Sequence, residues 1–255
     1  MSLSILLTAI LVLSRLGGAI MVMPGFAAMG MPRLVRMAIA IALTVLVVPS
    51  VPPTSIESDL VVLVASVMSE VTLGVLMGGS VAMVFGGLVF ATEIMGSQTG
   101  RMMAQQFNPL LKMSQGPIGI LAGMMATLVF FGLNLHLAVL FILSESFHDV
   151  RPGSAIAVMD VAAIWVGMAA PVLKAGLGLA GPVLALVFLV NCFVAVLAKL
   201  APSMNVFFSI GFILTMIAGM GLVYVTLPHL IEAHMAMVIE TVDALPEMVR
   251  AAGGK

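Results

Sequence analysis

Two carboxylates, Glu70 and Glu93, lie in or at the edge of one long apolar run and are the residues best placed for chemistry. An ionisable side chain at membrane depth is costly, so each is a candidate site for a proton or a cation. The alternative is a buried carboxylate paired with Arg101, Lys174 or backbone donors of a neighbouring helix. We favour the pairing, because no chain of Asp, Glu and His residues accompanies the two carboxylates as a proton relay would require.

Arg15 is also an ionisable residue within an apolar run, but it carries a positive charge. It lies midway along the apolar run 3–31. An arginine in such a place must pair with another group or extend its charged end to water. We therefore expect Arg15 to form a structural ion pair.

A metal site or an enzymatic centre is not indicated by the remaining polar residues. His229 and Glu232 are three positions apart, on one face of a helix, and His234 follows. A zinc site needs further ligands, and the sequence supplies none. No phosphate-binding loop of the GxxxxGK[ST] type occurs, and no catalytic set follows from spacing. We expect no metal, no cofactor and no enzymatic activity.

A polar stretch at residues 105–119 interrupts the apolar runs at mid-chain. The candidate loop residues in it are Phe107, Asn108, Pro109, Leu110, Leu111, Lys112, Met113, Gly116 and Pro117. The two prolines forbid a continuous helix and bias the residues before them to extended backbone. Such a loop could plug an aqueous path, with apolar side chains closing it by filling space and excluding water. The plainer alternative is a surface connection between two helices.

The composition places the elements that carry these residues in a membrane. Of 255 residues, 62% are hydrophobic and 8% charged, and the mean hydropathy is +1.26. An ordinary soluble domain has about 25% charged residues. The net charge of -1 excludes the basic footprint of a nucleic-acid-binding protein. We predict an all-α, polytopic membrane-type protein.

Apolar runs cover most of the chain, but their lengths are irregular. Six such runs occupy residues 3–31, 34–51, 60–92, 118–143, 155–198 and 206–230. A single span needs about 20 apolar residues, so the run 60–92 is too long for one upright helix. The run 155–198 contains Pro171 and Pro182, and we expect two short helices or a broken hairpin there. Broken helices and hairpins at membrane depth require protein or water around them.

Small residues and one amphipathic segment indicate close helix packing. Gly74 and Gly78, and likewise Gly96 and Gly100, are four positions apart on one helix face and favour contact between backbones. Residues 231–255 repeat apolar side chains at helical spacing, with acidic residues elsewhere. We predict one integral domain over residues 1–230, followed by an amphipathic C-terminal helix and tail that lies beside the membrane or a partner.

An ordered set of short motifs resembles the FliR family of flagellar export-gate proteins, to which the T-type subunits of virulence type III secretion systems are related. The resemblance begins at Arg15, Gly17 and Gly18, continues through Glu70, Gly74, Gly78, Glu93, Gly96 and Gly100 and through Phe107–Pro109, and closes with Pro202, Met204, Asn205 and Phe207. The chain departs from the family pattern at Asn108, Leu135 and Ser203 and at Ala91-Thr92. Each motif alone is weak, but their order and spacing cover nearly the whole chain.

The resemblance implies a role in protein export. A single copy would join P-type and Q-type export-gate subunits in a helical hetero-oligomer and contact the B-type and A-type export proteins. The assembly would lie in the bacterial inner membrane, in the flagellar basal body, and conduct unfolded substrate proteins. The loop at 105–119 would then be the plug of the closed channel.

Two other functions remain open from the sequence. One is a proton- or cation-coupled secondary transporter that uses Glu70 and Glu93, although no inverted repeat is apparent. The other is a scaffold without a conduit of its own, which would need its glycine faces and tolerate changes in the middle loop.

Overall fold

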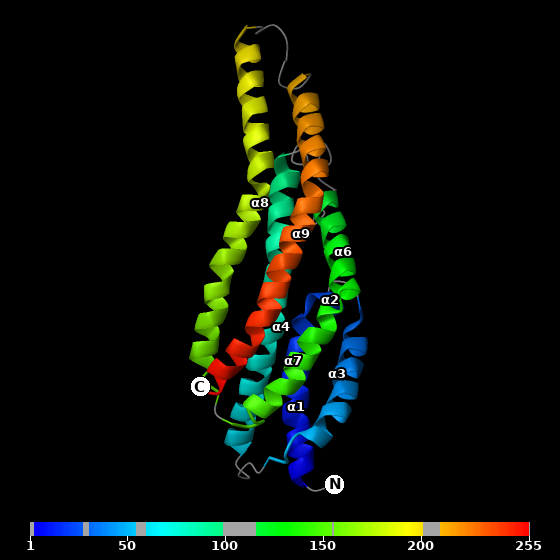
Figure 1. Ribbon diagram of the computed structural model, residues 1–255, viewed down its shortest axis with the longest axis vertical. Coiled ribbons are helices and arrows are strands. Elements are labelled where there is room, and N and C mark those ends of the chain that lie inside the picture. The colour runs from blue at the N-terminus through cyan, green and yellow to red at the C-terminus, as the bar shows by residue number, and fades with distance from the viewer. Residues whose placement is uncertain are drawn as a thin grey trace. The chain divides into compact units, whose positions relative to one another are not determined.

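A computed structural model shows a chain built from α-helices (Figure 1). It describes residues 3–27, 31–54, 60–98, 116–154, 156–200 and 210–254. In chain order the elements are α1 (Leu3–Val22), α2 (Pro24–Ala27), α3 (Arg33–Val47), the short 3₁₀-helix η1 (Val48–Ser50), α4 (Leu60–Gly96), α6 (Pro117–Gly132), α7 (Leu135–Asp149), α8 (Val158–Leu200) and α9 (Phe212–Ala252). No β-strand occurs in these ranges.

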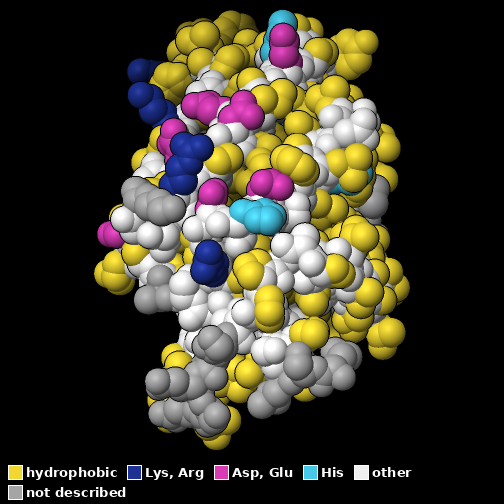
Figure 2. Space-filling model, turned by 60° about the horizontal axis from the view of Figure 1, so that its bottom comes forward, with side chains coloured by type: hydrophobic (Ala, Val, Ile, Leu, Met, Phe, Trp, Pro, Cys, Tyr) yellow, Lys and Arg dark blue, Asp and Glu magenta, His cyan; other side chains and the backbone are white. Residues whose placement is uncertain are grey.

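The helices have the length and composition of membrane spans. Within the described residues, α1, α3 with η1, α4, α8 and α9 each provide a helical segment long and apolar enough to cross a bilayer, and the bent pair α6–α7 could provide a sixth span. Large apolar side chains are exposed on these helices, including Leu34, Leu200 and Tyr224. Apolar side chains likewise cover much of the face shown in Figure 2. The prediction of an all-α polytopic membrane protein is confirmed.

Three helices exceed the thickness of a bilayer. Helices α4, α8 and α9 contain 37, 43 and 41 residues. At the standard helical rise they are about 55 to 65 Å long, against a hydrocarbon core of about 30 Å. A large part of each helix must therefore lie against protein or project beyond the lipid.

The chain divides into two compact units, each assembled from segments distant in sequence. The first comprises Met1–Val84, Thr127–Ala170 and Ala236–Lys255. In it α1 packs along α3 (Figure 1). Its core contains large side chains from α1, α4 and α7, among them Leu16, Leu73, Met77 and Phe147, all almost fully buried.

The second unit comprises Phe85–Ala126 and Pro171–Met235. Its buried residues include Leu88 and Met95 from α4 and Val183 and Val187 from α8. Gly87 and Gly176 bring the backbones of these two helices close together, because a Cβ at Gly176 would lie 2.9 Å from the Gly87 carbonyl oxygen. Small residues thus permit the close α4–α8 packing of this unit.

One expectation about helix breaks was wrong. The run 155–198 is not two short helices or a hairpin, because α8 continues through Pro171 and Pro182. Proline is tolerated inside apolar helices when local adjustment and neighbouring groups satisfy the freed carbonyls. The run 118–143 does break, at Asn134, whose φ of 56° is left-handed. Helices α6 and α7 meet there at a bend of 62°.

Residues 231–252 continue α9 without interruption. The repeated apolar residues of this segment, Ile231, Met235, Val238, Val242 and Leu245, are all buried. The acidic residues Glu232, Glu240, Asp243 and Glu247 are all exposed. The helical periodicity therefore separates a buried apolar face from an exposed acidic one, within a longer helix than the sequence pattern indicated.

Candidate functional site

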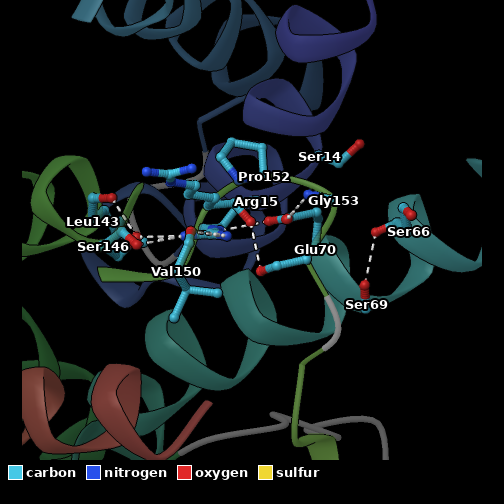
Figure 3. A network of polar contacts seen from close by, with 12 residues as sticks. Ser14, Arg15, Ser66, Ser69, Glu70, Leu143, Ser146, Val150, Pro152 and Gly153 are labelled. Atoms are coloured by element: carbon cyan, nitrogen blue, oxygen red, sulfur yellow. Dashed lines mark hydrogen bonds and ion pairs between the residues drawn. The ribbon is translucent and has the colours of Figure 1, made fainter. Parts of the chain in front are cut away.

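The main polar centre of the first unit is an ion pair between α1 and α4 (Figure 3). Arg15 Nε donates to Glu70 Oε2 at 2.6 Å, and both side chains are completely buried. The ion pair expected of Arg15 is thus present. The partners expected for Glu70 were Arg101, Lys174 or backbone donors of a neighbouring helix. Its ion-pair partner is instead Arg15, and a backbone N–H, that of Gly153, also donates to it. Arg15 lies 55 positions earlier in the chain.

The other two nitrogens of the guanidinium donate hydrogen bonds to α7 and to the residue that follows it. Arg15 Nη1 donates to both the carbonyl oxygen and the hydroxyl of Ser146, each at 3.0 Å, and Nη2 donates to the Val150 carbonyl at 3.1 Å. The guanidinium carbon also lies 4.3 Å from the centre of the Phe147 ring. Arg15 therefore holds the C-terminal turn of α7 against α1.

Glu70 is held on its second oxygen by the connection between α7 and α8. The N–H of Gly153 donates to Glu70 Oε1 at 3.0 Å. Gly153 has a φ of 79°, a left-handed conformation that glycine adopts without strain. Pro152, in the same connection, accepts a hydrogen bond at its carbonyl from the Thr54 hydroxyl at 3.1 Å. One buried pair thereby joins α1, α4 and the α7–α8 connection.

The Arg15–Glu70 contacts suit a structural role, in which they hold helices together, better than a role in proton transfer. Charges in a low-dielectric interior are tolerable when each is paired and its other hydrogen-bonding positions are filled. Both oxygens of Glu70 accept a hydrogen bond, and all three nitrogens of the Arg15 guanidinium donate. A carboxylate paired in this way does not offer a free site to a cation or a proton.

Two glycines of α4 allow the ion pair to form. A Cβ at Gly74 would overlap the carbonyl oxygen of Arg15 and lie 3.1 Å from the Ala19 nitrogen. A Cβ at Gly78 would overlap the Ala19 carbonyl oxygen. The backbones of α1 and α4 touch here, as the glycine spacing indicated. At Gly96, by contrast, a Cβ would meet no heavy atom of the described chain within 4 Å.

Glu93 occupies a second polar position, in the second unit. The N–H of Gly116 donates to Glu93 Oε1 at 2.7 Å, one residue before α6 begins at Pro117. A Cβ at Gly119 would lie 3.2 Å from the same oxygen and 3.3 Å from the Thr92 hydroxyl. A carboxylate at a helix N-terminus interacts favourably with the unpaired N–H groups and the helix dipole. Glu93 thus holds the start of α6 on α4, using a backbone donor.

His229 and His234, five positions apart on α9, do not form a common site. His229 Nδ1 lies 3.9 Å from Glu232 Oε2 at an exposed position of α9. His234 is fully buried, with its ring at 87° to that of Phe85 and 4.8 Å between centres. Within the described ranges, no group of three or more His, Cys, Asp or Glu side chains is arranged to hold a metal ion.

Several predicted site residues lie outside the described part of the chain. They are Gly100, Arg101, Phe107, Asn108, Pro109, Leu110, Leu111, Lys112 and Met113 in the middle stretch, and Pro202, Met204, Asn205 and Phe207 in the closing motif. Residues 116–119 are the described part of the predicted plug; Gly116 lies directly before α6, beside Glu93, and residues 117–119 form the first turn of that helix.

Comparison with known proteins decides the family. A model of the family described as "Bacterial export proteins, family 1" matches residues 6–241. The chain belongs to this family. The resemblance seen in the short motifs is confirmed, and Arg15, Glu70 and Glu93 all fall within the matched region.

Relatives of this bacterial export protein come from two kinds of system. It is 27% identical to a flagellar biosynthetic protein FliR of Caulobacter vibrioides, over 86% of this chain and 88% of the relative. Identity to a FliR of Escherichia coli K12 is 23%, over 84% and 85%. Identity to a Yop proteins translocation protein T of Yersinia pestis is 29%, over 81% and 80%. Neither these relatives nor the pairing of Glu70 favours the secondary transporter.

Proposed function

We propose that this chain is a membrane-embedded subunit of a flagellar-type, type III protein export gate, and that it helps to form and to plug the conduit for unfolded substrates. The family match over residues 6–241 is the observation that carries the proposal. The flagellar FliR relatives cover a somewhat larger share of both chains than the Yop translocation protein T does, which supports flagellar use. The proposed role is mechanical and requires no chemical step.

The proposed setting is the bacterial inner membrane, within the flagellar basal body. One copy would assemble with P-type and Q-type subunits and contact the B-type and A-type export proteins. The length of α4, α8 and α9 supports this setting, because helices much longer than the bilayer need protein neighbours along part of their surface.

The first test is the composition of the native assembly. The tagged chain, extracted from its own host in mild detergent, is expected to bring several copies of two smaller hydrophobic proteins with one copy of itself. Native mass spectrometry measures the masses and the ratio. Recovery of the chain alone, or as a simple homo-oligomer, would overturn the proposal.

The second test concerns the plug. In the proposed closed gate, Glu93 holds the C-terminal end of the 105–119 segment through the Gly116 N–H. A charge-assisted hydrogen bond contributes about 1.5–3 kcal/mol. Glu93→Ala is therefore expected to raise the leak of small ions through the assembled gate by about ten-fold. Ion flux into cells or gate-containing vesicles measures the leak.

Two further variants serve as the positive and the negative control for the leak measurement. Deletion of residues 107–113 is expected to leave assembly intact and give the largest leak. Glu240→Gln removes an exposed carboxylate of α9 and should leave the membrane tight. A tight membrane with normal export after the deletion would refute the plug. A leaky deletion variant together with a tight Glu93→Ala variant would refute only the role of Glu93.

A further inference from the structure

A pocket in the first unit lies between α7 and the last turns of α9. Its volume is about 150 Å³, space for roughly one side chain. Phe141 of α7 and Pro246 and Val249 of α9 provide apolar walls, and Glu145 and Asp149 of α7 also line it. The two acidic residues are four positions apart, on one helix face, and both are exposed.

The two carboxylates are uncompensated. Neither Glu145 nor Asp149 forms an ion pair within the described ranges. Acidic side chains also prevail around them. The segments 145–160 and 240–250 contain six acidic residues, all exposed: Glu145, Asp149, Asp160, Glu240, Asp243 and Glu247. Their basic residues are Arg151, Arg250 and the exposed His148, which lies beside Asp149 in the last turn of α7. Figure 2 shows a face on which acidic side chains lie among apolar ones, with Lys, Arg and His side chains beside them.

The walls of the pocket are held in place before any ligand arrives. Ser146, which also lines the pocket, receives two hydrogen bonds from the buried Arg15. The end of α9 is held because Ala157 N donates to the Ala252 carbonyl at 3.1 Å. A site that is already ordered loses little conformational entropy on binding.

We propose that this pocket is the docking site for an arginine side chain, carried on an apolar surface of another protein of the export apparatus. The aliphatic stem of an arginine fits apolar walls, and its planar guanidinium offers enough donors for two carboxylates. Exposed acidic side chains disfavour contact with lipid tails, so a protein is the fitting occupant. The inference rests on the proposed function, since the partner is taken from the same apparatus.

The experiment uses the full chain, tagged and produced with the other export-gate proteins of its host. Glu145→Gln with Asp149→Asn keeps the side-chain volumes and removes both charges. We expect the partner recovered per chain to fall about ten-fold, because a desolvated charge pair is costly to break. The control pair, Glu240→Gln with Asp243→Asn, removes equal charge outside the pocket and is expected to retain normal recovery. Equal loss in both pairs, or no loss in the first, would overturn the proposal.

A second measurement locates the contact directly. A photoreactive phenylalanine analogue placed at Phe141 is expected to cross-link to a gate subunit within a few residues of an arginine. Changing that arginine to glutamate should restore assembly to a Glu145→Lys, Asp149→Lys variant. Cross-links to lipid alone would overturn the proposal. If the unmodified chain recovers no export-gate proteins, the proposed function fails. If it recovers them and the pocket variant does so equally, only the docking site fails.

Discussion

Replacing Arg15 by Met is expected to destabilise the first unit by about 3–5 kcal/mol, the cost of leaving one charge of a buried pair without its partner. Glu70 would keep only the Gly153 N–H. The Ser146 hydroxyl and the Val150 carbonyl would lose the Arg15 donor, while the Ser146 carbonyl would keep the Val150 N–H. The chain should accumulate poorly in membranes and fail to support export. Thermal unfolding of the purified protein in detergent, with quantitative blotting of membranes, measures the two effects.

A double-mutant cycle separates the ion pair from the packing around it. Glu70→Met alone should be about as harmful as Arg15→Met, because it leaves a buried guanidinium without a counter-charge. The double variant should be less destabilised than the sum of the two, by about 2 kcal/mol or more. Strictly additive effects would show that the two side chains do not act as a pair. Loss of solute flux through the purified chain on Glu70→Gln would instead favour a transporter.

Gly74→Ala is expected to cost about 1–3 kcal/mol or more, although alanine is the better helix former. The new methyl group would occupy the position of the Arg15 carbonyl oxygen, so α1 and α4 must move apart. That movement also lengthens the Arg15–Glu70 contact, and the two losses reinforce each other. The midpoint of thermal unfolding should fall, and the same variant should recover fewer partner subunits.

Gly86→Ala is the matched control on the same helix. A Cβ at Gly86 would meet no heavy atom within 4 Å in the described part of the chain, and the position is exposed. The substitution should therefore be neutral or stabilising by up to about 1 kcal/mol. Equal destabilisation by the two alanines would mean that helix flexibility, and not the α1–α4 approach, is what Gly74 provides.

Several features followed from local chemistry and were predictable without a structure. The apolar composition required a membrane-type helical protein, because such a chain has too few polar residues to cover a soluble fold. The spacing of Gly74 and Gly78 indicated a close helix contact, and the periodicity of residues 231–245 separated buried from exposed positions. The need of Arg15 for a partner followed from the cost of burying a charge.

Other features depended on contacts between residues far apart in the chain. The pairing of Arg15 with Glu70, and not with another charge, follows from which helices pack together, which sequence spacing does not contain. The continuity of α8 through Pro171 and Pro182 depends on its surroundings, because proline weakens a helix locally but neighbouring groups can compensate. The pocket between α7 and α9 joins segments almost a hundred residues apart, so only their packing in the folded chain creates it. Local sequence determined what each helix is, and tertiary packing determined which charges, glycines and surfaces meet.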